Sequence, residues 1–212
     1  QRQMCIRDSN GAGAWTGGTT ISGGTLLANG TVPGPLTVNA GGTLGGTGTV
    51  AGPVTVNAGG SIAPGLSPGI TNTGNLSIAG TLVIEIEGTT IGTQYDNVNV
   101  TGTVGIAGGA LLVTGAFVPV AGTVFTIVSN DGADAVTGTF LGLAEGATVT
   151  LNGVPLVISY VGGTGNDITL TAQAAVAVAV PTLGEWAMLL LVLGVGLAGA
   201  LSLKRREGGL AA

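Results

Sequence analysis

The amino-acid sequence predicts an all-β protein: a parallel β-helix followed by one C-terminal transmembrane helix. Residues 10–171 alternate apolar with small polar residues in runs of four to eight. Gly-Gly, Asn-Gly, Pro-Gly and Asp-Gly pairs interrupt these runs, which is the pattern of short strands joined by turns. A direct repeat recurs in this stretch at an offset of 18 residues. Further on, seventeen uncharged residues, 187–203, end in a basic triplet.

The composition indicates a regular fold rather than an ordinary enzyme. Of 212 residues, 42 are Gly and only 7% are charged, against about 25% charged residues in an average soluble domain. Apolar residues still make up 45% of the chain, so there is enough apolar surface to bury, and disorder is not expected. We therefore expect the chain to fold into a repetitive architecture.

The distribution of charge excludes a nucleic-acid role. All five basic residues lie near the ends, at Arg2, Arg7, Lys204, Arg205 and Arg206, and residues 8–203 contain none. Nucleic-acid binding depends on Lys and Arg side chains that neutralise phosphates. The acidic body is also poorly suited to anionic lipid, so membrane contact is expected from the tail alone.

Residues 1–9 differ in composition from everything that follows. They contain the single cysteine, Cys5, and no apolar core of the kind a signal peptide needs. They look like a translated sequencing-adapter or cloning remnant, so we place the β domain at residues 10–172. On this interpretation the chain is a fragment whose export signal was lost with its true start.

The repeat is the strongest evidence for stacked coils. Residues 34–44 read GPLTVNAGGTL, and residues 52–62 read GPVTVNAGGSI. A period of 18 to 20 residues suits one coil of a β-solenoid, in which each coil buries its apolar face only against its neighbours. Three short strands per coil over the whole stretch predict roughly eight or nine coils. A Greek-key sandwich is the alternative that strands at this spacing also permit.

The sequence of the tail predicts a membrane anchor. A linker rich in Ala and Val, 173–180, precedes residues 181–207, and residues 208–212 follow. As a helix, the uncharged run would be about 26 Å long, near the lower limit for crossing a bilayer. Trp186 would lie at one interface, and the basic cluster Lys204, Arg205 and Arg206 would mark the cytoplasmic side. The β domain would then lie outside the cytoplasm; a buried core helix is the alternative.

Two further stretches resemble a known family of surface proteins. Residues 95–102, YDNVNVTG, resemble the YDxVxVTG element of bacterial autotransporter passenger-associated repeats. The run from Phe125 through residues 136–140 to residues 162–170 resembles the usual close of such a repeat unit. The resemblance implies an extracellular, single-stranded, right-handed parallel β-helix from a Gram-negative bacterium, and it names no ligand.

The tail resembles the IPTL-CTERM sorting domain. Residues 181–186 read PTLGEW and precede one hydrophobic segment and a terminal basic cluster. Val180 stands where the family usually has Ile, and Gly184 where it commonly has Ser. The resemblance implies that an exosortase-like membrane peptidase recognises a signature made of Pro181, Thr182, Leu183, Glu185 and Trp186. A plain anchor, in which Pro181 merely starts the helix, is the alternative.

Four motifs suggest chemistry, and each has a simpler structural interpretation. Residues 65–69 match the G-x-S-x-G nucleophile elbow, but the chain has no His to act as base, so Ser67 is interpreted as a turn residue. Residues 194–199 match G-x-G-x-x-G inside the apolar run, where small residues instead suit helix packing. Glu85 and Glu87 lie two residues apart on a predicted strand, so both side chains point to the same face, which we interpret as a face in contact with solvent. Residues 162–167 resemble a calcium-binding nonapeptide repeat. Such sites need stacked copies that share the ion, and the sequence contains only one copy.

We therefore expect no catalytic, cofactor or metal site and interpret the chain as a non-enzyme. The predicted function is that of an exported structural or adhesin-like protein of the cell surface, with an extracellular carbohydrate or protein as ligand. It would be held by its C-terminal helix and processed, or released, through its sorting signal. The competing hypothesis is a fragment of a polysaccharide-active β-helix enzyme whose catalytic part is missing.

Overall fold

The computed structural model describes residues 6–9, 17–174, 184, 186–193 and 195 of the chain. The chain divides into two compact units, Gln1–Ala175 and Val176–Ala212, which are described separately. The first unit is the β domain, and its described residues form strands and turns without a helix. In the second unit the described residues, Gly184, 186–193 and Val195, are helical.

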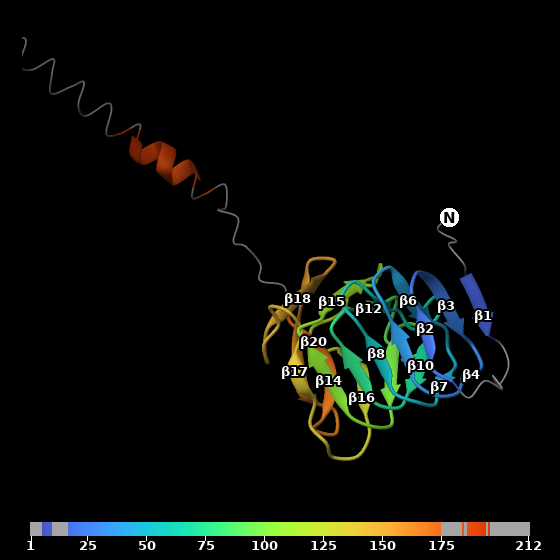
Figure 1. Cartoon of the computed structure of the whole chain (residues 1–212). Helices are drawn as coiled ribbons and strands as arrows, with labels where there is room; N and C mark the ends of the chain where they lie inside the picture. Colours follow the sequence, from blue (N-terminus) through green and yellow to red (C-terminus); the bar gives the residue numbers. More distant parts are fainter. Residues whose placement is uncertain (1–5, 10–16, 175–183, 185, 194, 196–212) are drawn as a thin grey trace, which may run out of the picture. The chain divides into compact units, whose positions relative to one another are not determined.

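Three sheets build the β domain (Figure 1). The first sheet contains β1 (Ile6–Ser9), β3 (Gly24–Ala28), β6 (Gly42–Gly45), β9 (Ser61–Ile62), β12 (Thr81–Glu85) and β15 (Ala110–Thr114). The second contains β2 (Thr19–Ile21), β5 (Leu36–Val38), β8 (Val54–Val56), β11 (Leu76–Ile78), β14 (Val104–Ala107) and β17 (Thr137–Thr139). The third contains β4 (Thr31–Val32), β7 (Thr49–Val50), β10 (Ile70–Thr73), β13 (Asn97–Val100), β16 (Val124–Asn130), β20 (Asp167–Ala172), β19 (Val154–Gly162) and β18 (Thr148–Leu151).

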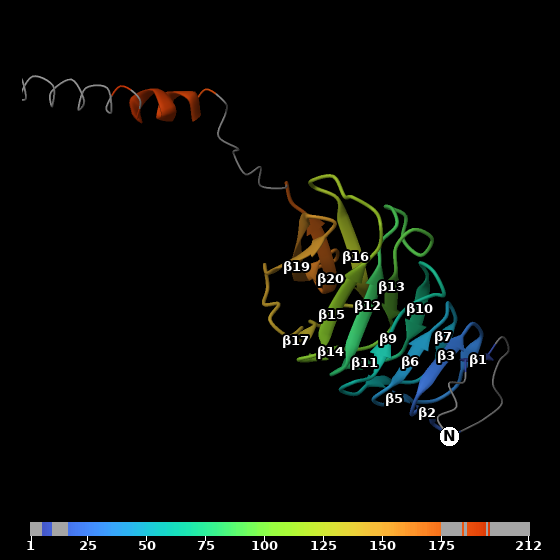
Figure 2. The ribbon, with the colours of Figure 1, turned by 90° about the horizontal axis from the view of Figure 1, so that it is seen from above.

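From β2 to β17, successive strands visit the second, first and third sheets in turn, and we call each passage a coil (Figure 2). Neighbouring strands of these coils pair in parallel. The repeat sets the register, because Leu36 pairs with Val54, and Leu44 with Ile62, each 18 residues further on. The prediction of stacked parallel coils is confirmed, and the Greek-key alternative is wrong for these residues.

Glycine pairs form the corner that leads into the first sheet. Gly41 and Gly59 have φ of 81° and 80°, in the left-handed region that glycine adopts without strain. At Gly42 a Cβ would lie 2.7 Å from the carbonyl oxygen of Ile21 on the preceding coil, and at Gly60 it would lie 2.8 Å from that of Val38. The repeated Ala-Gly-Gly sequence thus provides both the sharp turn and the close approach of adjacent coils.

Aliphatic side chains fill the inside of the coils. Strands β5 and β8 of the second sheet point their first and third residues inward, so that Leu36, Val38, Val54 and Val56 are almost fully buried. The Thr between them faces outward, as the two-residue period of a strand requires. The coils therefore share one continuous core, which accounts for the small number of apolar residues each needs.

The coils lengthen along the chain, and the stack ends in antiparallel strands. Strand pairs join residues 18 apart at Leu36 and Val54, but 28 apart at Leu76 and Val104. Beyond β16, strands β20, β19 and β18 continue the third sheet in antiparallel order. The expectation of eight or nine coils is wrong, since the second sheet has six strands among the described residues. The 18-residue period holds only in the first coils, and residues 140–172 form no further coil.

Part of the segment set aside as an adapter remnant is a strand in the structure. Ile6–Ser9, β1, pairs in parallel with β3 at the end of the first sheet. The domain therefore does not begin cleanly at residue 10 as predicted. Parallel pairing uses backbone groups, which every sequence has. The strand therefore does not test whether residues 1–9 are a cloning remnant, and that origin stays a prediction.

The helix of the second unit is short within the described residues. No helix in this part of the chain is long and apolar enough to cross a membrane. Of the predicted span, 187–203, the residue Gly194 and residues 196–203 lie outside the described residues. The transmembrane helix and the handedness of the coils remain predictions.

Candidate functional site

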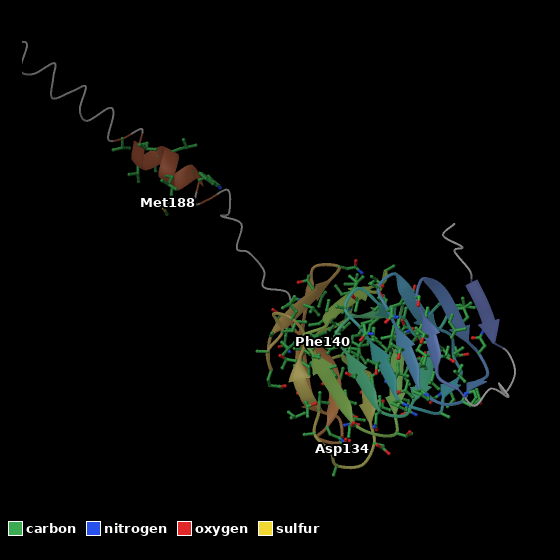
Figure 3. The ribbon with its side chains drawn as sticks, in the orientation of Figure 1. Asp134, Phe140 and Met188 are labelled. Atoms are coloured by element: carbon green, nitrogen blue, oxygen red, sulfur yellow. The ribbon has the colours of Figure 1, made fainter. Side chains whose placement is uncertain are left out.

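The helical segment of the tail presents apolar side chains on all its sides. Trp186, Met188, Leu190 and Val192 are each more than half exposed (Figure 3). A helix that is apolar all round becomes buried in protein or lipid. Trp186 is the one signature residue that the structure describes. Pro181, Thr182, Leu183 and Glu185 lie outside the described residues, as do Lys204, Arg205 and Arg206.

The outer faces of the coils carry columns of polar, uncharged side chains. On the second sheet, Thr37 pairs with Thr55, and Thr55 pairs with Ser77 of the next coil. Asparagines add side-chain bonds between coils: Asn57 donates through Nδ2 to Oδ1 of Asn39 at 2.8 Å, and Asn99 donates likewise to Asn72 at 3.0 Å. These faces suit hydrogen bonding to a polar ligand, but they also suit stacking alone.

Longer loops follow the later strands of the first sheet, β9, β12 and β15, and a buried carboxylate joins the first two of these loops. Asp96 accepts hydrogen bonds from the backbone N–H groups of Gly69 and Glu85, each at 2.8 Å. Its side chain is buried, and burial raises the pKa of the carboxyl from 3.8 to about 6, opposed by these two hydrogen bonds. The nearby Glu85 charge also raises this pKa. Asp96 thus fastens the loop at residues 63–69 to the end of β12.

The two glutamates of the predicted solvated face have different surroundings. Glu85 ends β12 and is half-buried, whereas Glu87 is exposed in the loop beyond it. Oε1 of Glu87 accepts the backbone N–H of Ala116 at 3.1 Å, which joins this loop to the following coil. The prediction that both point outward from the strand fits Glu85. Glu87 serves a loop contact that the sequence period could not show.

Ser67 lies exposed in the loop between β9 and β10. A strand follows it, Ile70–Thr73, where a nucleophile elbow would have a helix. The chain contains no His that could take the hydroxyl proton. The interpretation of residues 65–69 as a turn is confirmed.

The loop at residues 162–167 forms part of a polar network that closes the last coils. Asp167 accepts the backbone N–H of Asn130 at 2.8 Å and that of Thr164 at 3.2 Å. Asn166 donates to the carbonyl oxygens of Asp131, Gly132 and Asp134. The Asp167 carboxylate therefore accepts hydrogen bonds from backbone amides and holds this loop against the end of β16.

Exposed large apolar residues of the β domain gather toward its C-terminal end. Eight are more than a third exposed: Leu66, Ile91, Leu112, Val118, Val120, Val124, Leu141 and Val161. Four of them lie between Leu112 and Val124, in β15, β16 and the loop that joins these strands. The sequence did not reveal this group, because an apolar residue on an irregular loop has no period that predicts its direction.

Along the chain, the repetitive β domain is followed by an apolar segment that ends in basic residues. A comparison with protein families finds the IPTL-CTERM motif, a C-terminal sorting signal, at residues 178–206. This supports the predicted C-terminal sorting domain, and with it a secreted or cell-surface protein. No curated protein matches the chain, and the likeness to autotransporter repeats stays a prediction.

Proposed function

We propose that this chain is an exported surface protein whose β domain is displayed outside the cytoplasm and whose tail is a membrane anchor and sorting signal. The match of the IPTL-CTERM motif to residues 178–206 carries the proposal. An exosortase-like peptidase recognises residues 181–186, while the apolar run at 187–203 enters the bilayer and the basic cluster stays on the cytoplasmic side.

The β domain acts as a structural or adhesin-like module related to autotransporter repeats. Stacked coils give a scaffold held by backbone ladders and a continuous aliphatic core. Polar uncharged columns line its faces, and longer loops project at one corner of the later coils. Rigid scaffolds of this kind present recognition loops without chemistry of their own. Its ligand is an extracellular carbohydrate or protein.

The proposal includes no catalytic role. The absence of His from the sequence leaves Ser67 without its usual base, and no Lys or Arg lies between residues 8 and 203. The most prominent buried carboxyl, Asp96, is held by two backbone amides and serves the contact between coils. These features support a display function over polysaccharide cleavage.

Processing of the tail tests the proposal. The chain is produced behind an export signal in a host that carries the sorting peptidase, with a tag near Gln173. The mature size is compared with that of a Pro181→Ala, Thr182→Ala double variant. Val176→Ala, outside the matched motif, is the control.

We expect a peptidase-dependent size shift in the parent protein and the control variant, and its loss in the double variant. If all three keep the full tail and fractionate with the inner membrane, the sorting function is wrong and a plain anchor remains.

A further inference from the structure

The place where the chain leaves the β domain is fixed by hydrogen bonds. Ala172, the last residue of β20, accepts the backbone N–H of Gly122 at 2.8 Å and donates its own N–H to the carbonyl oxygen of Thr123 at 2.8 Å. Thr171 lies opposite Val124 in the antiparallel pair of β20 and β16. The exit of the tail is therefore adjacent to the segment 118–124.

Three valines in this segment are exposed to solvent. Val118, Val120 and Val124 have exposed fractions of 59%, 74% and 53%. The loop cannot turn them inward easily, since Pro119 is buried between the first two and the N–H of Thr123 bonds to the carbonyl oxygen of Val120. We call these three residues the valine patch. Exposed apolar residues that lie together can mark a site of interaction with a protein or a membrane.

Aromatic packing holds both ends of the segment. Phe117 and Phe125 lie directly before Val118 and after Val124, with their ring centroids 6.4 Å apart in an edge-on contact. Phe125 also meets Tyr95 edge-on at 5.3 Å and is fully buried. The valine patch therefore stands on a rigid base in the core.

The surroundings of the exit carry little charge. Residues 97–130 and 168–184 contain no charged side chain. Glu87 is linked to the start of this segment, since its Oε1 accepts the N–H of Ala116. An uncharged surface can approach a bilayer without desolvating ions. The acidic groups elsewhere in the domain disfavour other orientations on lipid with a negative charge.

The length of the tether limits the distance between the patch and the bilayer. Thirteen residues, 173–185, lie between Ala172 and Trp186, so even a fully extended chain spans only about 50 Å. If Trp186 lies at the membrane interface, as under the proposed function, the exit of the β domain stays within this distance of the lipid. A tether of this length raises the effective concentration of the patch at the surface, so weak contacts are sufficient.

We propose, resting on the proposed membrane anchor, that the valine patch docks the β domain onto the lipid bilayer on the outer side of the membrane. Val118, Val120 and Val124 enter the interfacial region, as apolar residues of peripheral proteins do. Docking orients the domain with the tail exit at the lipid and the earlier coils away from it. The Ala/Val linker and the sorting signature are then presented beside the membrane, where a membrane peptidase acts.

Depth-dependent fluorescence tests the docking on the full chain in phosphatidylcholine vesicles. A Val120→Cys variant in a Cys5→Ser background carries an environment-sensitive fluorophore, and Thr31→Cys, on the exposed edge strand β4, is the matched control. Vesicles are prepared with and without nitroxide groups on the lipid acyl chains. Flotation of the vesicles separately shows whether the tail enters the bilayer.

We expect flotation of both variants, with a blue shift and strong nitroxide quenching at position 120 and neither effect at position 31. Adding Val118→Ser and Val124→Ser should abolish the quenching at position 120 without changing flotation. Flotation without quenching at either position would overturn the docking and leave the anchor intact. Equal quenching at both positions would overturn the orientation. If neither variant floats, the membrane anchor fails, and the docking fails with it.

Discussion

The early coils and the late coils are stabilised in different ways. In residues 36–62 two neighbouring coils share one set of contacts: Thr37 pairs with Thr55, Asn39 bonds to Asn57, and both coils have the Ala-Gly-Gly corner. In residues 63–172 single residues make contacts that have no counterpart one coil away, such as Asp96, Phe125 and Tyr160. A repeat distributes its stability over many small equivalent contacts. The long loops and the antiparallel strands β20, β19 and β18, which we call the cap, depend instead on single contacts of this kind. The long loops lie in the same part of the chain as these single contacts.

The largest difference should come from the aromatic centre of the late coils. Phe125→Ala removes a fully buried ring that packs against Tyr95 and Phe117. We expect a loss of about 3–5 kcal/mol in the free energy of unfolding, measured by urea denaturation of the β domain within the full chain. Leucine at the same position should restore part of the loss. A loss below that of an exposed substitution such as Val161→Ala would show that the aromatic centre does not support the cap.

The buried carboxyl of Asp96 should make stability depend on pH. Its pKa of about 6 lies above its ordinary value of 3.8, so the folded protein binds the proton more tightly than the unfolded chain. The stabilisation is complete below the unfolded pKa and is lost as pH rises through about 6. Between about pH 7 and pH 4 the contribution is on the order of 2 kcal/mol.

The matched variant for this effect is Asp96→Asn, which has the same shape and no titration. Its stability should lack the rise on acidification that the parent protein shows in thermal or urea unfolding. A rise of the same size in both proteins would assign the pH dependence to the other carboxyls.

The hydroxyl of Tyr160 closes the cap. It donates to the carbonyl oxygen of Leu143 at 2.7 Å and accepts the N–H of Phe140 at 2.9 Å. Tyr160→Phe leaves both backbone groups without this partner, at a cost of about 1–2 kcal/mol. Thr150→Val, on the exposed side of β18, serves as the control and should change stability by less than about 0.5 kcal/mol. Hydrogen exchange should show the loss at residues 140–147 first.

The smallest effect should come from the repeat itself. Asn57→Ala removes one exposed side-chain bond to Asn39, and we expect about 0.5 kcal/mol in urea unfolding. The contact recurs in kind between other coils, so no single copy should be essential. A loss as large as that of Phe125→Ala would contradict the contrast between the two regions.

The sequence predicted the early coils well, because their contacts repeat. Residues 34–44 and 52–62 already show which strands pair and which residues turn inward. The late coils were predicted less well: the number of coils was overestimated, because loops near residues 63–69 and 86–96 lengthen the period. The antiparallel cap was not expected, since alternation of apolar and polar residues does not distinguish parallel from antiparallel pairing.

For the functional regions, local motifs were informative and contacts between distant residues were not. The tail was recognised from contiguous residues, and the motif match at 178–206 supports it. The roles of Asp96 and Glu87 depend on partners 27 and 29 residues away along the chain. The exposure of Val118 and Val120 depends on the direction of a loop, which no periodicity fixes. Such features follow from the tertiary structure alone.

Exposure of the β domain outside the cytoplasm is the central claim, and an epitope in the loop at residues 66–68 tests it most directly. Leu66 and Ser67 are exposed there, so an inserted tag should not disturb the core. The chain is produced behind an export signal in a host that carries the sorting peptidase, and protease is added to spheroplasts with a closed inner membrane. We predict that the tag is digested while a cytoplasmic marker stays protected. Protection of the tag until the membrane is opened with detergent would contradict export.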